Sequence, residues 1–259
     1  MPRSLVTGAG KRLGRTMALY LADRGHDVAV HYARSADAAD AVVAEIRAKG
    51  RNAVALGADL LQEDQAQALL PAAAEALGGA VTCLVNNASI FEYDNIRTAT
   101  REGWDRHMNS NLRAPFVLIQ AMAAQGLGVA TDEAGEPVAT GLVVNMIDER
   151  VRKLTPEFMT YTLAKMGLWA LTQTASRALA PAIRVNAIGP GPTLQGERQS
   201  EAHFTAQRAA TILERGANPN DITAALGYFL DAPAVTGQLL CVDGGQHLGW
   251  RTPDVLGVE

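Results

Sequence analysis

A tyrosine and a lysine four residues apart, Tyr161 and Lys165, are the two side chains whose spacing most directly suggests chemistry. Residues four apart on a helix share one face, so these side chains are expected to lie together. A nearby ammonium group favours the phenolate and lowers the pKa of the phenol, which would let Tyr161 exchange a proton near neutral pH. Such pairs are common on helix surfaces, so the interpretation depends on the surrounding elements.

A glycine-rich turn near the N-terminus is the second chemical feature. Residues 7–14 read Thr-Gly-Ala-Gly-Lys-Arg-Leu-Gly and follow a short apolar run. Glycines let the backbone turn tightly and approach a pyrophosphate, while the next helix points its N-terminus at the negative charge. No lysine follows Gly14, so the segment is not the GxxxxGK phosphate loop.

The end of the second expected strand indicates which dinucleotide would bind. It reads His-Tyr-Ala-Arg-Ser over residues 31–35. An acidic residue there would accept hydrogen bonds from the ribose 2′-hydroxyl of NAD, and Ala33 cannot do so. Arg34 and Ser35 can instead pair with a 2′-phosphate, so the predicted cofactor is NADPH/NADP+.

Strand-like and helix-like segments alternate along the whole chain. The expected strands are 3–7, 28–32, 53–56, 81–86, 141–147, 183–188 and 239–242. Helical stretches lie between them, the longest at 104–125 and 158–179. This alternation predicts right-handed crossovers and a parallel sheet. We therefore expect an α/β fold, namely one Rossmann-like domain over residues 1–259, with a doubly wound parallel sheet of about seven strands and helices on both faces.

Two segments interrupt the alternation. Residues 126–140 are rich in Gly, Asp and Glu and are expected to form an exposed excursion. Residues 193–216 follow a Gly-Pro-Gly-Pro turn after the sixth strand. Because ligands sit beyond the carboxyl ends of strands in such sheets, this segment is a candidate substrate lid. A solvated surface helix is the alternative.

Composition excludes several classes of function. The net charge of −4 argues against a general nucleic-acid binder. No apolar run reaches the roughly 18 residues of a membrane helix, and the N-terminus has no signal-peptide pattern, so a cytoplasmic location is expected. Cys83 and Cys241 lie in apolar segments and are interpreted as buried free thiols. No cluster has metal-ligand spacing.

Five separated motifs make the sequence resemble the short-chain dehydrogenase/reductase family from Leu5 to about Gly245. They include the turn at residues 7–14, Asn-Asn-Ala at 86–88, and Tyr161 with Lys165. The resemblance implies that Tyr161, Lys165 and Asn111 belong to the active site, where the asparagine holds a water that links the lysine to solvent. The implied cofactor-binding residues are Gly8, Arg12, Leu13, Gly14, Tyr32, Arg34, Ser35, Asp59, Leu60, Asn87, Ala88, Ser89, Tyr161, Lys165, Pro190, Gly191 and Thr193.

Asp148 departs from the general family pattern. It lies where the family usually has a serine that donates a hydrogen bond to the oxyanion of a reacting carbonyl. An ionised aspartate cannot donate and would repel that oxyanion. A carboxylate suits a C=N group in a pterin ring, and could also bind the pterin amino group or orient Tyr161. Pteridine reductases carry aspartate at this position.

Two further residues resemble the pteridine reductases and their bacterial dihydromonapterin/dihydrofolate reductase relatives. Arg12 replaces the usual middle glycine of the turn, and that subfamily's arginine lies beside the cofactor phosphate and the pterin. Phe91 follows Asn86–Ile90 and matches a phenylalanine that stacks on the pterin. A surface arginine and a core phenylalanine are the alternatives.

The sequence therefore predicts an NADPH-dependent reductase of a C=N bond in a dihydropterin or dihydrofolate, with Asp148, Tyr161, Lys165 and Asn111 as catalytic residues. Arg12, Phe91, Asp148 and Tyr161 would contact the substrate. Two alternatives stay open, a carbonyl reductase of the same fold and a non-catalytic NADP(H)-binding sensor. Family analogy also implies a homotetramer.

Overall fold

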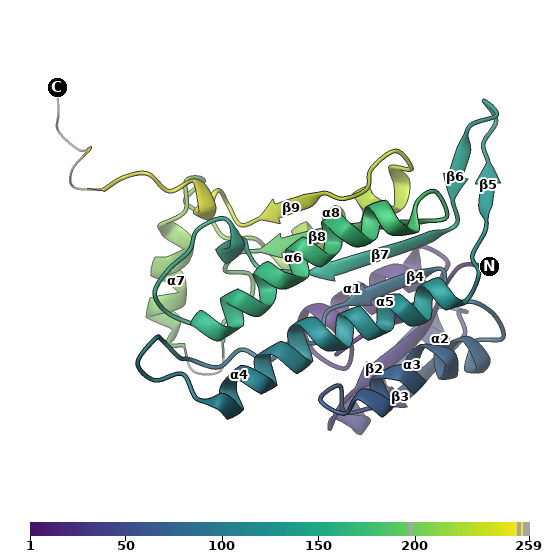
Figure 1. Cartoon of the computed structure of the whole chain (residues 1–259), viewed down its shortest axis with the longest axis horizontal. Coiled ribbons are helices and arrows are strands. Elements are labelled where there is room, and N and C mark those ends of the chain that lie inside the picture. The colour runs from purple at the N-terminus through teal and green to yellow at the C-terminus, as the bar shows by residue number, and fades with distance from the viewer. Residues whose placement is uncertain (197–198, 253–254, 256–259) are drawn as a thin grey trace.

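The computed structural model describes residues 1–196, 199–252 and 255. In this part of the chain, seven parallel strands form one sheet in the order β3-β2-β1-β4-β7-β8-β9 (Figure 1). The strands are β1 (Arg3–Val6), β2 (Asp27–Tyr32), β3 (Ala53–Gly57), β4 (Cys83–Asn86), β7 (Gly141–Met146), β8 (Ile183–Pro190) and β9 (Leu239–Val242). The predicted α/β fold class and strand number are confirmed.

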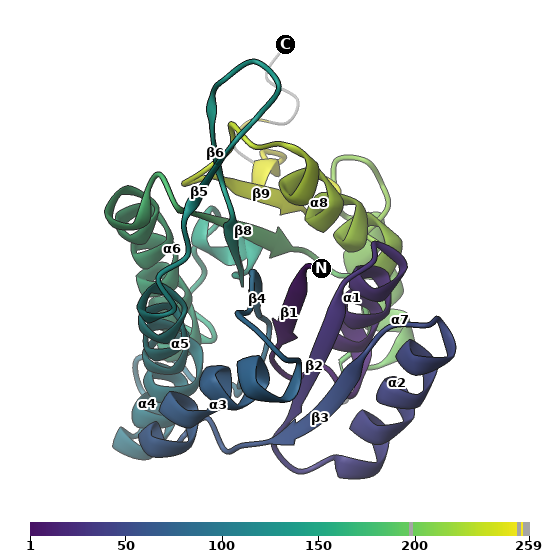
Figure 2. The same cartoon turned by 90° about the vertical axis from the view of Figure 1, so that its right-hand side faces the viewer.

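Helices cover both faces of the sheet (Figure 2). One face packs against α1 (Arg12–Asp23), α2 (Ala36–Ala48) and α8 (Pro219–Asp231). The other face packs against α3 (Glu63–Ala76), α5 (Ala114–Ala124) and α6 (Met159–Leu179). The sheet is therefore buried between two layers of helices.

The strand sequences fit this burial because successive side chains point to opposite faces. In β2, Val28 and Val30 belong to the core under α1 and α2, whereas Ala29 belongs to the core under α3 and α5. A strand buried on both faces must be apolar at nearly every position, which is why the strands read as continuous apolar runs.

The predicted helix over 104–125 is three elements in the structure. These are α4 (Arg101–Met108), a π-helical turn at Asn109–Arg113 and α5. The predicted helical stretch is thus helical up to Ala124, and the π turn within it was not foreseen because side-chain periodicity does not report a single π turn.

The predicted excursion over 126–140 is largely exposed, and it contains an antiparallel hairpin that the sequence did not reveal. The hairpin pairs β5 (Val129–Thr131) with β6 (Pro137–Ala139). It projects away from the sheet (Figure 1). The segment after β8 contains α7 (Glu201–Ala209). Residues 197–198 of the predicted lid, and 253–254 and 256–259 of the predicted domain, lie outside the described residues.

Candidate active site

The predicted site residues follow strands that end at the same edge of the sheet. Val6 pairs with Val85, Asn86 with Asn145, and Met146 with Ile188. The carboxyl ends of β1, β4, β7 and β8 are therefore neighbours, and the loops that follow them share one edge. This is the edge at which ligands bind in open α/β sheets.

The glycine-rich turn after β1 is held tightly against the loop after β4. Gly8 has a φ of +63°, which a residue with a Cβ rarely adopts. A Cβ on Gly14 would lie 2.2 Å from the carbonyl oxygen of Gly8. The Asn87 amide donates to the carbonyl oxygens of Thr7 and Gly8, at 2.8 and 3.2 Å. Glycine at position 14 is therefore a packing requirement.

A cavity of about 470 Å³ lies between this turn and the segment after β8. Nine of the predicted cofactor residues line it: Gly8, Arg12, Leu13, Gly14, Asn87, Ala88, Ser89, Gly191 and Thr193. Main-chain amides, cationic side chains and the N-terminus of α1 together suit the diphosphate part of a dinucleotide. The residues present therefore fit an NADP(H) cofactor.

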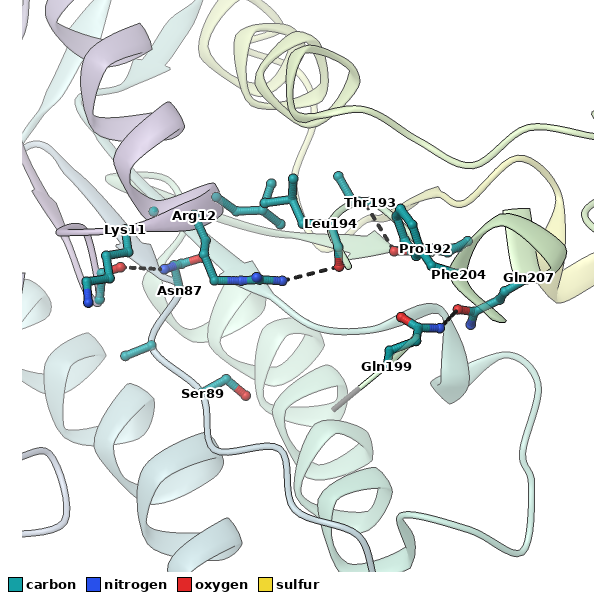
Figure 3. Close-up of a pocket in the computed structure, with 15 residues that line it drawn as sticks. Lys11, Arg12, Asn87, Ser89, Pro192, Thr193, Leu194, Gln199, Phe204 and Gln207 are labelled. Carbon is teal, nitrogen blue, oxygen red and sulfur yellow. Dashed lines mark hydrogen bonds between the residues drawn. The ribbon is translucent and has the colours of Figure 1, made fainter. Parts of the chain in front are cut away.

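The same cavity is lined by further residues that the sequence did not single out individually, although four of them lie in the 193–216 segment predicted as a candidate lid. Figure 3 shows Gln199, Phe204 and Gln207 on the opposite side from the glycine-rich turn, and the amide of Gln199 donates to Gln207 Oε1 at 2.9 Å. Lys11 follows the second glycine of the turn and could have been noted as a second cation. The α7 residues carry no motif, because only the chain path brings them to the cofactor turn. The other unpredicted lining residues are Pro192 and Leu194.

Arg12 has a backbone conformation that is more typical of glycine. Its φ is +53°, in the left-handed region that favours glycine. Its guanidinium crosses the cavity and donates to the carbonyl oxygens of Leu194 and Gln195, at 3.2 and 3.0 Å (Figure 3). Arg12 therefore lies at the predicted site and joins the cofactor turn to the segment after β8.

The residues predicted to select NADP lie outside the lining of this cavity. Ser35 precedes the first residue of α2, and its hydroxyl lies 3.3 Å from the position that a Cβ on Gly10 would take. Arg34 precedes it at the end of β2. The Ser35 hydroxyl therefore lies beside the glycine-rich turn, and the binding of a 2′-phosphate by Arg34 and Ser35 stays a prediction.

Three more predicted cofactor residues also lie outside the lining, at the ends of β2 and β3. Tyr32 packs against Gly57, and Asp59 accepts a hydrogen bond from the amide of Leu61 at 3.0 Å. Leu60 lines a separate cavity of about 80 Å³ beside α3.

Asp148 and Tyr161 form the centre of the predicted catalytic group. The Tyr161 hydroxyl donates to Asp148 Oδ2 at 2.8 Å, and the backbone amide of Arg150 donates to Asp148 Oδ1 at 2.9 Å. Asp148 follows β7, and Tyr161 lies in the first turn of α6. The carboxylate therefore faces the tyrosine hydroxyl and is fixed by a main-chain hydrogen bond.

The predicted effect on the pKa of Tyr161 was wrong in direction. Burial raises the pKa of Tyr161 well above its ordinary value, and the negative charge of Asp148 raises it further. Burial also raises the pKa of Asp148. Removing a phenolate and a carboxylate from water disfavours both charged forms, and for Tyr161 this outweighs the opposing effects of the Arg150 charge and of a hydrogen bond with Ser89. Tyr161 is therefore protonated at neutral pH and is suited to donate a proton.

Lys165 is buried beneath Tyr161. Its Nζ donates to the carbonyl oxygen of Met146 at 2.8 Å and lies 5.6 Å from the centroid of the Tyr161 ring. Burial lowers the pKa of Lys165 to about 8, although Asp148 opposes the shift. The predicted neighbourhood of Tyr161 and Lys165 on one helix face is confirmed.

Asn111 lies in the π-helical turn and is fully buried. Its side-chain oxygen accepts from the amide of Ile90 at 2.9 Å, and its side-chain nitrogen donates to the Ile90 carbonyl at 2.8 Å. Through these two hydrogen bonds Asn111 holds the loop after β4 against the helix beside the active site. The water-holding role implied by the family stays a prediction.

Phe91 is 45% exposed, so it is not a core residue. Its ring stacks on Phe158, with centroids 4.3 Å apart and planes 7° apart, and meets the Tyr161 ring edge-on at 4.7 Å. Phe158 was not singled out in the sequence. It precedes α6 and has a φ of +54°, an unusual conformation for a bulky residue. The structure thus joins Phe91 to Tyr161 through a group of aromatic rings.

Pro190, the remaining predicted cofactor residue, is the last residue of β8. Thr193 donates from its hydroxyl to the Gly191 carbonyl at 3.0 Å. Further along, the backbone amide of His247 donates to Asp243 Oδ2 at 2.8 Å.

Among residues 1–196, 199–252 and 255, no group of His, Cys, Asp and Glu side chains is placed to hold a metal.

Glu149 is a buried acid next to Asp148, and among the described residues its Oε2 has no hydrogen-bond partner. Burial, assisted by Asp148 and Asp243, raises its pKa to about 7. The folded protein binds this proton more tightly than the unfolded chain, so the contribution to stability is complete below the unfolded pKa of about 4.5 and is lost as pH rises through about 7.

Between pH 5 and pH 8 the wild type is therefore expected to lose roughly 2–3 kcal/mol more unfolding free energy than Glu149→Gln. Urea denaturation at both pH values measures the difference. Glu133→Gln, on the exposed hairpin, is the control and should leave the pH dependence unchanged. Equal pH dependence in wild type and Glu149→Gln would contradict the prediction.

Comparison with known proteins places this arrangement in a family. Residues 8–247 match the family model described as enoyl-(acyl carrier protein) reductase. A relative, 3-oxoacyl-[acyl-carrier-protein] reductase FabG of Staphylococcus epidermidis, is 32% identical over 250 residues, covering 95% of this chain and 98% of the relative.

Two solved structures match almost the whole chain. FolM alternative dihydrofolate reductase 1 from Brucella suis, in complex with NADP, is 40% identical with a TM-score of 0.90, covering 98% of each chain. A short chain dehydrogenase from Burkholderia cenocepacia J2315, in complex with NADP, is 32% identical with a TM-score of 0.84, covering 95% of this chain and 97% of that chain.

The chain belongs to the short-chain dehydrogenase/reductase family. Its structural neighbours include the FolM reductases, a pteridine reductase-like group within that family. These neighbours were solved with NADP, so the chain is an NADP-dependent reductase, and the predicted family and cofactor are confirmed. No helix in the described part of the chain has the length and apolar character needed to cross a membrane.

Proposed function

We propose that this protein is an NADPH-dependent reductase of a C=N bond in a dihydropterin or dihydrofolate. The observation that carries the proposal is the Asp148 carboxylate, 2.8 Å from the Tyr161 hydroxyl. A carbonyl reductase needs a second hydrogen-bond donor at that position to stabilise an oxyanion, and a carboxylate cannot serve. A ring nitrogen that gains a proton, or an amino group that donates one, is compatible with it.

The residues of this chain would divide the chemistry as follows. NADPH supplies the hydride when it is bound. Tyr161, whose pKa is raised by burial, would deliver a proton to the substrate nitrogen. Asp148 would hold the tyrosine hydroxyl or the pterin amino group, and Lys165 would hold the ribose hydroxyls of the cofactor. Asn111 would hold a water that resupplies the proton.

The substrate slot would be framed by Arg12 and Phe91. Arg12 lines the cofactor cavity, and the exposed Phe91 ring lies edge-on to Tyr161, which supports this assignment. Flat heteroaromatic rings gain from face contacts with such a side chain. Arg34 and Ser35 would bind the 2′-phosphate. Closure of the 193–216 segment as a lid stays a prediction, and its support is that Phe204 and Gln207 line the cavity.

The test is consumption of NADPH by the purified protein with dihydrobiopterin, dihydromonapterin or dihydrofolate, followed at 340 nm. We expect turnover with at least one of them and slower turnover with ketones. A carbonyl reductase is the second candidate, favoured by the 32% identity to FabG. Brisk reduction of a ketone or 3-oxoacyl thioester without pterin turnover would establish it, and tight NADPH binding without any turnover would indicate a sensor.

We also propose that the protein is a homotetramer located in the cytoplasm. Exposed apolar side chains on α4, α5 and α6, including Trp104, Phe116 and Leu163, support association through these helices. Cys83 and Cys241 are free thiols, which suits a reducing compartment. Light scattering in solution measures the mass, and a monomeric mass would contradict the tetramer.

A further inference from the structure

A buried polar network lies directly behind the catalytic tyrosine. It consists of Asp94 from the loop after β4, His107 from α4 and Thr160 from the start of α6. Each residue is at most 6% exposed. Helix α4 packs against α6 (Figure 1), which brings these three side chains together although they are far apart in the sequence.

The hydrogen bonds of the network run in one direction. The backbone amide of Glu92 donates to His107 Nε2 at 3.2 Å, so that nitrogen carries no proton. His107 Nδ1 then carries the proton and donates to Thr160 Oγ1 at 2.6 Å. The threonine hydroxyl in turn donates to Asp94 Oδ2, and its backbone amide donates to Asp94 Oδ1 at 3.1 Å. Burial lowers the pKa of His107, which agrees with a neutral ring.

The network ends on backbone atoms next to Phe91, Phe158 and Tyr161. Glu92 adjoins Phe91, and Thr160 adjoins Tyr161. The backbone amide of Phe158 donates to the carbonyl oxygen of Asp94 at 2.8 Å. This bond holds Phe158 at its unusual positive φ, where its ring stacks on Phe91. Backbone strain of this kind persists only where the surrounding structure fixes it.

We propose that Asp94, Thr160 and His107 are positioning residues that set the Phe91–Phe158 ring pair relative to the Tyr161 hydroxyl, and thereby set substrate affinity and turnover. The proposal rests on the proposed function only for the choice of substrate. A displacement of about 1 Å at such a site can cost a hundredfold in rate without loss of fold. None of the three side chains lines the cofactor cavity, so cofactor binding should be unaffected.

Thr160→Val removes the hydroxyl and keeps the shape of the side chain. We expect the KM for dihydrobiopterin to rise about tenfold and kcat to fall several-fold, at most about a hundredfold in kcat/KM. The Kd for NADPH, measured by fluorescence, should stay within about twofold. Thr160→Ser retains the hydroxyl and should recover most of the activity. Thr174→Val, an exposed position on the same helix, is the matched control and should resemble wild type.

Three results would overturn the proposal. These are wild-type kinetics in Thr160→Val, equal impairment in Thr160→Ser, or a parallel weakening of NADPH binding that reveals general disruption. If Thr160→Val does not fold, His107→Gln keeps an acceptor for the Glu92 amide and breaks the bond to Thr160, and wild-type kinetics in that variant would overturn the proposal. If the wild type reduces no dihydropterin, the proposed function fails separately, and the same variants are compared on the ketone that is reduced.

Discussion

Tyr161→Phe is expected to lower kcat for dihydropterin reduction by about three orders of magnitude while leaving the Kd for NADPH nearly unchanged. The hydroxyl of Tyr161 is 2.8 Å from Asp148 Oδ2 and is the group placed to deliver a proton. Its raised pKa keeps the phenol protonated at neutral pH, so removing the hydroxyl removes the proton donor. Phenylalanine preserves the ring contacts with Phe91, which limits the change to the proton.

Tyr93→Phe is the matched control for this prediction. Tyr93 lies in the same group of rings, edge-on to Phe158 at 5.2 Å, and is 52% exposed. Its hydroxyl has no place in the proposed chemistry, so turnover should stay close to wild type. A Tyr161→Phe variant that keeps a tenth of the wild-type kcat would mean that another group supplies the proton. The measurement is steady-state turnover over pH 6–9 with NADPH titrated separately.

Much of the fold was predictable because parallel strands buried on both faces must be apolar. Continuous apolar runs separated by helical stretches located all seven strands of the sheet. The predicted parallel sheet also placed the expected ligand site beyond the carboxyl ends of its strands, and the structure shows that β1, β4, β7 and β8 are neighbours there. Tyr161 was identified from its spacing to Lys165 and Asp148 from the family resemblance, and the structure places the two side chains in contact.

The parts that sequence did not predict depend on contacts between distant segments. The 193–216 segment was predicted to lie near the ligand, but the contribution of Phe204 to the cofactor cavity depends on how that segment folds back over the turn after β1. Asp94, His107 and Thr160 carry no motif, and only the packing of α4 on α6 joins them. The predicted shift in the pKa of Tyr161 was wrong in direction, because the spacing revealed the nearby lysine but could not reveal how deeply the tyrosine is buried.

Asp148→Ser is expected to lower kcat/KM for dihydropterin by about a hundredfold and to raise activity on ketones. The serine would restore a hydrogen-bond donor where a carbonyl oxyanion develops. It would also remove the carboxylate, which accepts a hydrogen bond from the Tyr161 hydroxyl and could accept one from a pterin amino group. Turnover of one dihydropterin and one ketone, measured side by side, gives the ratio of the two activities.

Asp148→Asn separates the charge of Asp148 from its shape. The amide oxygen can still accept from the Arg150 backbone, and the amide NH2 would then donate to the Tyr161 hydroxyl oxygen, so the two side chains can stay in contact with that one hydrogen bond reversed. If the negative charge selects the pterin, Asp148→Asn loses nearly as much dihydropterin activity as Asp148→Ser but gains less ketone activity. If the carboxylate only orients Tyr161, Asp148→Asn stays close to wild type with both substrates. Undiminished dihydropterin turnover in both variants would remove the argument for a pterin, because it depends on a carboxylate in the place of a hydroxyl.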